Sequence, residues 1–158
     1  MKEHVSMTGR GEDKRMRYLL LVSHGTFAPG LHSVLDMLVG KREDILSCSL
    51  RDGEGADEYV AELEKVVAPI GGGDEVIVMG DIIGGSPLTN ALNVLAGHGL
   101  LARTRAFGGV SLPMALTAAL DLQTDDPMAL CSSALSEGQA AMREMELELA
   151  ADEDEEDL

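Results

Sequence analysis

The amino-acid sequence predicts a single α/β domain with a doubly wound, mainly parallel sheet and helices on both faces. Three apolar segments, at residues 18–23, 45–50 and 75–80, have the length of strands. Segments with apolar residues at helical spacing lie between them, and the connections are short, as crossovers between parallel strands require. The chain has 158 residues, of which 45% are hydrophobic, so it is long enough for one core and short for two.

The first strand is expected at residues 18–23 (YLLLVS), where apolar residues follow one another without alternation. Such a run is typical of a strand buried on both faces. His24 and Gly25 stand at its carboxyl end, and a turn is expected over residues 25–30. A helix that ends at Gly40 follows, because apolar residues recur at helical spacing at Leu31, Val34, Leu35 and Leu38.

The middle of the chain repeats this pattern. The segment ILSCSL (45–50) predicts a second strand, and a helix over residues 56–68 is ended by Pro69. The apolar face of that helix consists of Tyr59, Val60, Leu63, Val66 and Val67. The segment EVIVMG (75–80) predicts a third buried strand, which runs into Asp81 and IIGGSP. A helix is then expected from Pro87 through Leu95.

The last third of the chain predicts one more strand and two helices. The strand is expected within Leu100–Phe107, and Arg103 and Arg105 at alternate positions indicate that it lies near the sheet edge. Pro113 starts one helix and Pro127 starts the last, which is expected to reach Leu149. Its apolar positions are Leu130, Ala134, Met142, Met145 and Leu149. Residues 1–16 are expected to be a disordered leader, 17–149 the folded domain, and 150–158 a disordered acidic tail.

Charge and hydropathy exclude some classes of partner. The formal net charge is -16, and nine acidic residues from Glu144 onward leave about -7 for residues 1–143. This modest acidity argues against nucleic acid as a partner. No apolar stretch approaches the roughly 20 residues that span a bilayer, and the N-terminus lacks the apolar region of a signal peptide. We therefore expect a cytoplasmic protein, in which Cys48 and Cys131 act as small buried hydrophobic residues.

Two polar residues stand at the ends of predicted strands. His24 follows the first strand and Asp81 the third, and these strands are commonly neighbours in a doubly wound sheet. A carboxylate that accepts a hydrogen bond from one imidazole nitrogen fixes the tautomer and leaves the other nitrogen as a nucleophile. Taken singly, each has an ordinary structural interpretation, a hydrogen-bonding histidine and an aspartate in a turn.

The segment Gly84, Gly85, Ser86, Pro87 adds a third element. The glycines let the backbone bend closely, Ser86 is suited to cap a helix, and Pro87 suits the first helical turn. Exposed amides at a helix start, together with a serine hydroxyl, can bind phosphate oxygens. The combination of a nucleophile, an orienting carboxylate and an anion-binding turn is more specific than any one of these elements. We expect no metal and no cofactor at this site.

The stretches LLLVSHG, VMGDIIGGSPLTNAL and GGVSLPM occur in this order within Arg17–Met145. In these stretches the chain resembles the IIA component of the mannose family of bacterial phosphoenolpyruvate-dependent sugar phosphotransferase systems. The resemblance implies that His24 is transiently phosphorylated, that Asp81 is its carboxylate partner, and that Ser86 belongs to the phosphoryl-binding turn with Gly84 and Gly85. It also implies a homodimer, whose contact is expected on the later half of the chain, including the strand and helix around Leu100–Leu122.

The same resemblance implies partners. The phosphoryl group would arrive from the phosphocarrier protein HPr and leave for a cysteine or histidine of a IIB component, in uptake of a sugar of the mannose, fructose or sorbose class or in its regulation. The membrane would be reached only through the IIC/IID permease. Two departures bear on partner choice: Ile83 stands where some members carry an aromatic residue, and Ser111 replaces the asparagine of GVNLPM.

Two alternatives remain open from the sequence. The chain could be a non-transporting regulator that uses the same site as a phosphorylation sensor. It could instead be a chelatase-like or histidine-phosphatase-like enzyme, because V-x-H-G at the end of a first strand also resembles those groups. A histidine phosphatase would carry arginine where Ser23 stands, and a chelatase would need a second metal-binding histidine near the site.

Overall fold

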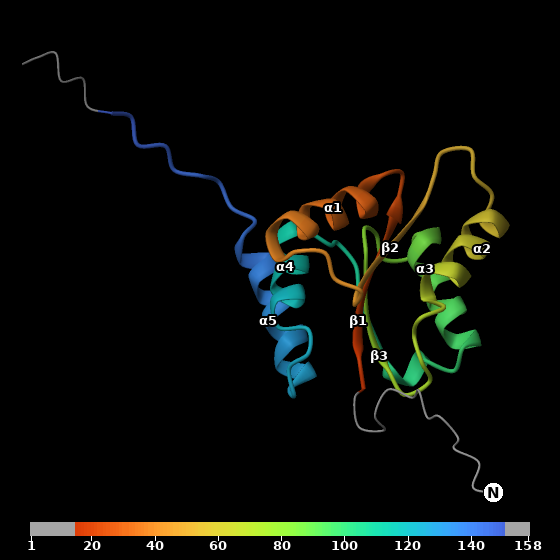
Figure 1. The fold of residues 1–158 in the computed structure, drawn as a ribbon. Coiled ribbons are helices and arrows are strands. Elements are labelled where there is room, and N and C mark those ends of the chain that lie inside the picture. The colour runs from red at the N-terminus through yellow and green to blue at the C-terminus, as the bar shows by residue number, and fades with distance from the viewer. Residues whose placement is uncertain (1–14, 151–158) are drawn as a thin grey trace, which may run out of the picture.

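The computed structural model describes residues 15–150, which form a four-stranded parallel sheet with helices on both faces. The strands are β1 (Arg17–His24), β2 (Ile45–Leu50), β3 (Glu75–Gly80) and β4 (Thr104–Phe107). The helices are α1 (Phe27–Val39), α2 (Ala56–Val67), α3 (Ser86–Gly97), α4 (Leu112–Leu120) and α5 (Pro127–Ala140), and a short 3₁₀ helix, Leu101–Arg103, precedes β4. The order β2-β1-β3-β4 confirms the predicted doubly wound fold (Figure 1).

The central strand β1 is buried by a helical layer on each face. Leu19 and Leu21 pack with α1, α4 and α5, whereas Leu20 and Val22 pack with α2 and α3. All four side chains are fully buried, and each such burial contributes about 1.5–3 kcal/mol. Figure 1 shows the two layers on opposite sides of the sheet. Two apolar faces explain why this strand lacks the alternation of a half-exposed one.

The strand predictions are confirmed, with one refinement at the sheet edge. β4 occupies an edge of the sheet, and Arg105 on it is exposed, as the alternation indicated. Arg103 is not part of the strand, because residues 101–103 form the 3₁₀ helix. Cys48 and Cys131 are buried free thiols. None of the helices among residues 15–150 is long and apolar enough to cross a membrane.

Two predicted boundaries are wrong. The turn expected over residues 25–30 is shorter, because α1 already begins at Phe27. The last helix ends at Ala140 instead of Leu149. Its buried residues, Leu130, Cys131 and Ala134, all lie in its first half, and the apolar side chains beyond residue 141 have no helical face to bury. The expected leader (residues 1–16) and acidic tail (150–158) lie almost wholly outside the described residues.

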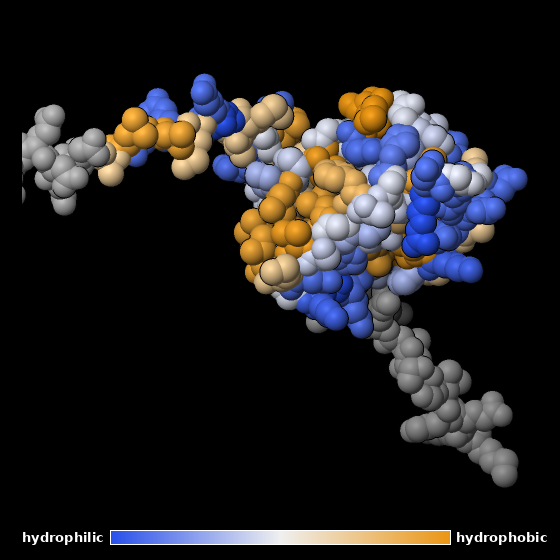
Figure 2. Space-filling model, turned by 90° about the horizontal axis from the view of Figure 1, so that it is seen from above, coloured by the Kyte–Doolittle hydropathy of each residue, from blue (hydrophilic) through white to orange (hydrophobic). Residues whose placement is uncertain are grey.

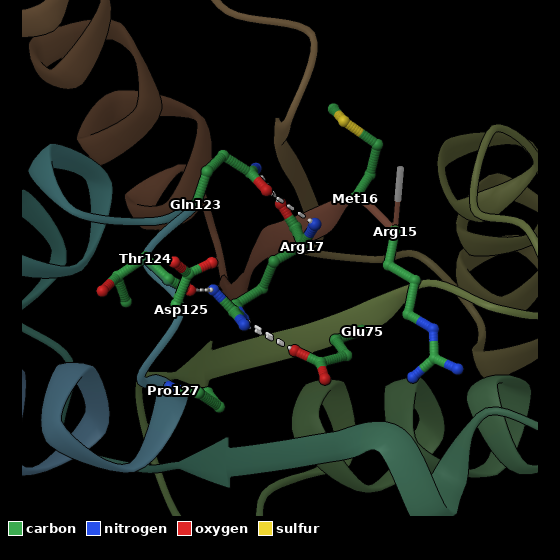
Figure 3. A pocket seen from close by; sticks show the side chains of 8 residues that line it. All are labelled: Arg15, Met16, Arg17, Glu75, Gln123, Thr124, Asp125 and Pro127. Atoms are coloured by element: carbon green, nitrogen blue, oxygen red, sulfur yellow. Dashed lines mark hydrogen bonds and ion pairs between the residues drawn. The ribbon is translucent and has the colours of Figure 1, made fainter. Parts of the chain in front are cut away.

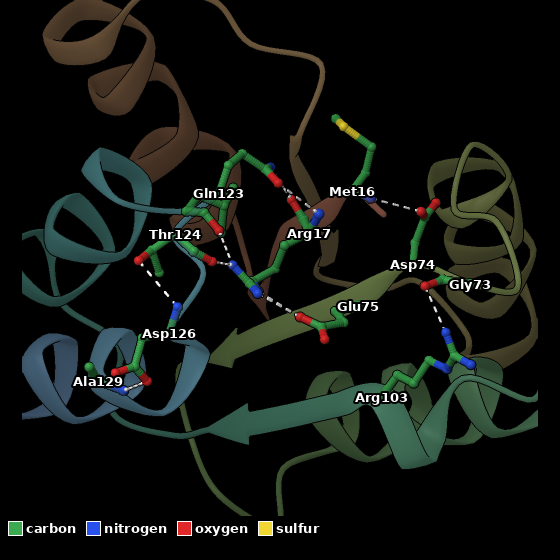
Figure 4. A network of polar contacts seen from close by, with 11 residues as sticks. Met16, Arg17, Gly73, Asp74, Glu75, Arg103, Gln123, Thr124, Asp126 and Ala129 are labelled. Atoms are coloured by element: carbon green, nitrogen blue, oxygen red, sulfur yellow. Dashed lines mark hydrogen bonds and ion pairs between the residues drawn. The ribbon is translucent and has the colours of Figure 1, made fainter. Parts of the chain in front are cut away.

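A polar network joins the α4–α5 connection to the amino ends of β1 and β3. The Arg17 guanidinium donates to Glu75 Oε2 at 2.8 Å and to the carbonyl oxygens of Leu122 and Thr124 at 2.6 and 2.9 Å. Gln123 adds a reciprocal pair of bonds with the Arg17 backbone. Figure 4 shows these residues converging from three segments. The charge of buried Arg17 is therefore paired, and its donors fix the edge of the sheet opposite His24.

Asp44, just before β2, is the basis of a stability prediction. Arg42 donates to its two carboxylate oxygens at 2.9 and 2.7 Å, and Gln123 donates to Oδ2 at 3.0 Å. Burial raises the pKa of Asp44, but these hydrogen bonds outweigh burial and hold it below its ordinary value of 3.8. We expect Asp44→Asn to lower the free energy of unfolding at pH 7 by about 1–3 kcal/mol. The substitution replaces one buried carboxylate oxygen with an NH₂ group, which then faces the N–H donors of Arg42 or Gln123.

The pH dependence of this difference follows from linkage. A carboxyl with a depressed folded-state pKa contributes stability above its unfolded pKa and loses it as the pH falls through the folded value. The difference in free energy of unfolding between the unchanged protein and Asp44→Asn should therefore become smaller as the pH drops below 3.8. Urea unfolding of both proteins, at pH 7 and at a series of pH values below 4, measures this difference. Asp52→Asn, at an exposed position, is the control. A difference that stays constant with pH would contradict this assignment.

Candidate functional site

His24 and Asp81 meet at the carboxyl edge of the sheet. His24 is the last residue of β1, and Asp81 directly follows β3. These strands are parallel neighbours in which Val22 is opposite Gly80, so the two side chains emerge side by side. His24 Nδ1 lies 2.8 Å from Asp81 Oδ2, and the imidazole is 47% exposed. The pairing predicted from strand order is therefore present in the structure.

Asp81 uses both carboxylate oxygens. Oδ2 accepts from the His24 backbone N–H at 3.0 Å as well as from the ring, and Oδ1 accepts from the Ile82 N–H at 3.0 Å. Partial burial raises the pKa of Asp81, but the His24 hydrogen bonds outweigh it, so the pKa lies below the ordinary value of 3.8. The carboxylate is therefore ionised at neutral pH. It orients the ring with Nδ1–H toward itself and leaves Nε2 facing away, with its lone pair available.

The β3–α3 loop brings backbone against the imidazole. Gly84 has a φ of +80°, which glycine adopts without strain, and the Gly85 N–H closes the turn on the Ile82 carbonyl at 3.3 Å. A Cβ at Gly85 would lie 3.1 Å from His24 Cε1, so a larger residue would press on the ring. The first turn of α3 therefore starts next to the histidine, and Pro87 occupies its N-terminal end.

The predicted capping role of Ser86 is wrong. Gly85 is the residue that precedes α3, and no side chain caps the helix. Ser86 is instead its first residue and is exposed, with Oγ accepting from Asn90 Nδ2 at 2.9 Å. The Ser86 hydroxyl proton thus remains available to a ligand. Ser111, the departure noted in the sequence, accepts from the Met114 N–H and caps α4.

Sequence reasoning missed three residues that support the site. Ser23 is fully buried, accepts from the Ala28 N–H at 2.7 Å, and donates to the His24 carbonyl at 3.0 Å. It therefore connects the end of β1 to the start of α1. A serine inside the apolar run YLLLVS was the available signal.

The other two supporting residues act on α3. Tyr59 on α2 is fully buried and donates to the Pro87 carbonyl at 2.8 Å. Gly80 leaves room for Leu88, whose side chain would lie 3.0 Å from a Cβ at that position. The hydrogen bond holds the first turn of α3 against α2, and the absence of a side chain at Gly80 lets that turn lie close to the end of β3. Neither could be found from the sequence, because each depends on packing between separate elements.

The remaining described histidines lie elsewhere. His32 Nδ1 pairs with Ser47 Oγ at 2.7 Å on the α1 side of β2, and His98 Nε2 pairs with Glu64 at 2.6 Å between α3 and α2. A polar cleft of about 510 Å3 lies at the amino edge of the sheet, between Arg17, Glu75 and the residues around Thr124 (Figure 3). It is at the opposite end of the strands from His24 and is not part of this site.

Comparison with known proteins identifies the family. The family model described as PTS system fructose IIA component (EIIA-man) matches residues 18–134. The chain is similar to the mannose/sorbose-specific IIA subunit of Enterococcus faecalis, at 24% identity with a TM-score of 0.71, covering 86% of this chain and 99% of that one.

Two further solved structures share the fold. One is the IIA protein associated with the fucose utilization operon of Streptococcus pneumoniae, at 24% identity and a TM-score of 0.70, covering 83% of this chain and 94% of that one. The other is a sigma-54 interaction domain protein of Enterococcus faecalis, at 15% identity and a TM-score of 0.63, covering 82% and 98%. The chain therefore belongs to the mannose-type IIA family, the phosphoryl-carrier components of sugar phosphotransferase systems.

Proposed function

We propose that His24 carries the phosphoryl group, accepting it at Nε2 from phospho-HPr and passing it to a cysteine or histidine of a IIB component. The observation that carries this proposal is the 2.8 Å contact between Nδ1 and the Asp81 carboxylate, which turns Nε2 outward. In the first step the donor's P–N bond breaks, its electron pair returns to the donor imidazole, and a new P–N bond forms at Nε2. The Nδ1 proton stays between ring and carboxylate.

The surroundings favour this transfer electrostatically. As Nε2 is phosphorylated the ring gains positive character, which the ionised Asp81 stabilises. The arriving phosphoryl oxygens are negative, and the free amides of the first turn of α3 and the Ser86 hydroxyl are donors beside Gly85. Gly84 and Gly85 allow the backbone to lie close enough for these donors to act. Placement and electrostatics together supply what phosphoryl transfer requires.

The test is direct phosphorylation. The protein is incubated with phosphoenolpyruvate, enzyme I and HPr, and its intact mass is followed. We expect the mass of one phosphoryl group to be added, and peptide mapping to place it on His24. Label that is then lost to purified IIB supports a carrier, whereas label that stays would favour the regulator with a sensing site. No phosphorylation under these conditions would contradict the proposal.

The cellular setting follows from this role. A protein that accepts the phosphoryl group from HPr and passes it to IIB works in the cytoplasm. It reaches the membrane only through a IIC/IID permease. The mannose, fructose or sorbose class remains the proposal for the sugar. The two IIA relatives above are named for mannose/sorbose and for a fucose operon, so the fold is shared by carriers that serve different sugars.

We also propose that the protein is a homodimer held by exchange of its extended C-terminal segment. Beyond α5 the chain runs away from the body (Figure 1). Met145, Leu147 and Leu149 there are 79%, 76% and 91% exposed and alternate with three glutamates, which is the pattern of a strand and not of a helix. The outer edge of β4 pairs with no strand among residues 15–150, and it carries Arg105. If this segment pairs with the β4 edge of a second copy, its apolar side chains are covered and the backbone groups of the β4 edge gain hydrogen-bond partners.

Truncation tests the exchange. Removing residues 142–158 should convert the dimer to a monomer, because both the pairing backbone and the apolar side chains are lost. Removing only residues 151–158 is the control and should leave a dimer. Light scattering at micromolar concentration measures both variants. A full-length protein that shows only the 16.7 kDa species would rule out the dimer.

A further inference from the structure

A second cluster of polar side chains, Ser47, His32 and Asp36, lies between α1 and the edge strand β2. Leu46 and Cys48 pack with the α2–α3 side of the core, so Ser47 between them faces α1. His32 and Asp36 are four residues apart on α1 and share the face that meets β2. His32 Nδ1 lies 2.7 Å from Ser47 Oγ, and His32 Nε2 lies 3.6 Å from Asp36 Oδ1. The imidazole therefore lies between a hydroxyl and a carboxylate.

The carboxylate sets the role of each ring nitrogen. Asp36 near Nε2 favours the tautomer that carries its proton there, which leaves Nδ1 as the acceptor. The Ser47 hydroxyl then donates to Nδ1, so its proton is directed at a base. The His32 and Asp36 side chains are 24% and 29% exposed, so the cluster is partly shielded from water and still accessible. A hydroxyl that faces a base oriented by a carboxylate is the arrangement of an activated nucleophile.

Ser47 also lines a cavity of about 250 Å3 at the outer edge of β2. Among residues 15–150, β2 pairs only with β1. The carbonyl oxygens of Asp44 and Leu50 each accept a 2.8 Å hydrogen bond from the β1 side, so alternate residues face β1 and the Ser47 N–H points outward. This N–H can donate to a negative oxygen that forms next to Oγ. One residue thus offers the cavity both a nucleophile and a hydrogen-bond donor.

The wall of this cavity carries more positive than negative charge. Arg51 and Lys65 line it together with Glu62. Because these groups are close to solvent, the excess cation should favour an anionic ligand by only about two- to fivefold in affinity. Figure 2 shows mostly hydrophilic surface on the α2 side of the molecule, whereas apolar surface gathers on the side from which the C-terminal segment leaves. The ligand that fits is therefore small, polar and negatively charged, and not a lipid chain.

We propose that Ser47 is the nucleophile of a second active site that hydrolyses small anionic carboxylic esters, with His32 as general base and Asp36 as its positioning residue. Ser47 Oγ attacks the ester carbonyl carbon while its proton passes to His32 Nδ1. The tetrahedral intermediate collapses as His32 returns this proton to the leaving alcohol, which gives an acyl-Ser47. Water then attacks the acyl group in the same way and releases the acid. This site shares no residue with the His24 site and does not depend on the proposed function.

Labelling tests the nucleophile. The protein is incubated with diisopropyl fluorophosphate, which forms an O–P bond with an activated serine and releases fluoride, and is then analysed by intact mass and peptide mapping. We expect one adduct, on Ser47, and none in Ser47→Ala or His32→Ala. Ser33→Ala is the control, because it removes an α1 hydroxyl that bonds to the Gly30 carbonyl, and it should be labelled as the unchanged protein is. No adduct, or an adduct on another residue, would overturn the proposal.

Ester hydrolysis tests the roles of the other residues. The anionic substrate is 3-acetoxy-4-nitrobenzoate, and the neutral one is the corresponding benzamide. Ser47→Ala and His32→Ala should lower kcat/KM for the anionic ester about tenfold or more. Asp36→Asn should lower kcat about tenfold and leave KM unchanged, because Asp36 acts through His32. His98→Ala, which breaks a histidine–carboxylate pair elsewhere on the surface, is the control and should hydrolyse normally.

Each result bears on a stated part of the proposal. Hydrolysis that persists unchanged in Ser47→Ala would overturn the active site. Equal kcat/KM values for the two esters would overturn the anionic substrate class, and Lys65→Gln should reduce the expected two- to fivefold preference to about one. Thermal unfolding shows whether each variant is folded. The adduct mapped on the unchanged protein decides the assignment of the nucleophile where a variant does not fold.

Discussion

Replacing His24 with alanine is expected to abolish phosphorylation by phospho-HPr while leaving the fold intact. The imidazole is 47% exposed and its side-chain partner is Asp81, so little packing is lost. Asp81 keeps the backbone N–H of residue 24 and that of Ile82 as donors, and its charge therefore remains hydrogen-bonded. No other described histidine lies at this edge of the sheet. Intact mass spectrometry after incubation with phosphoenolpyruvate, enzyme I and HPr measures the effect.

The matched control is His32→Ala. His32 lies on α1, bonded to Ser47 and 3.6 Å from Asp36, and takes no part in the His24 site. This variant should gain the phosphoryl mass as the unchanged protein does, and thermal unfolding shows whether each variant is folded. A His24→Ala protein that still acquired the phosphoryl group from HPr would mean that another residue is the carrier.

The strands and the His24–Asp81 pair could be predicted because both depend on short-range signals. A run of apolar residues without alternation identifies a strand covered on both faces, and His24 and Asp81 directly follow such runs. Once β1 and β3 are neighbours, their carboxyl ends meet without any further information.

The supports of the site could not be predicted in this way. Tyr59 bonds to Pro87, which is 28 positions away, through packing between two helices that periodicity does not encode. The end of α5 was missed for a related reason. Met142, Met145 and Leu149 have helical spacing in the sequence. A helix in water is stabilised mainly by packing of its apolar face, and these three side chains are exposed in the structure.

Asp81→Asn is expected to slow phosphoryl transfer about a hundredfold or more, in both directions, with the fold preserved. The amide keeps the shape of the carboxylate but has one acceptor where Asp81 uses two. If its oxygen faces His24, its NH₂ points at the Ile82 N–H; if it faces Ile82, the NH₂ points at the His24 ring and backbone N–H. Either arrangement leaves donors opposed, and the negative charge that stabilises the phosphorylated ring is absent.

The pH dependence of this variant tests whether Asp81 acts as an ionised carboxylate. The pKa of Asp81 lies below 3.8, so in the unchanged protein the carboxylate is ionised throughout the range where transfer is measured and its help does not vary there. The deficit of Asp81→Asn should therefore be nearly constant above about pH 5. Rapid-quench measurement of transfer from phospho-HPr and to IIB gives both rates. Asp121→Asn, at an exposed position after α4 near the opposite edge of the sheet, is the control. Unchanged rates in Asp81→Asn would reduce Asp81 to a turn residue that only holds the loop, and the nucleophile would then have to be oriented by something other than its 2.8 Å partner.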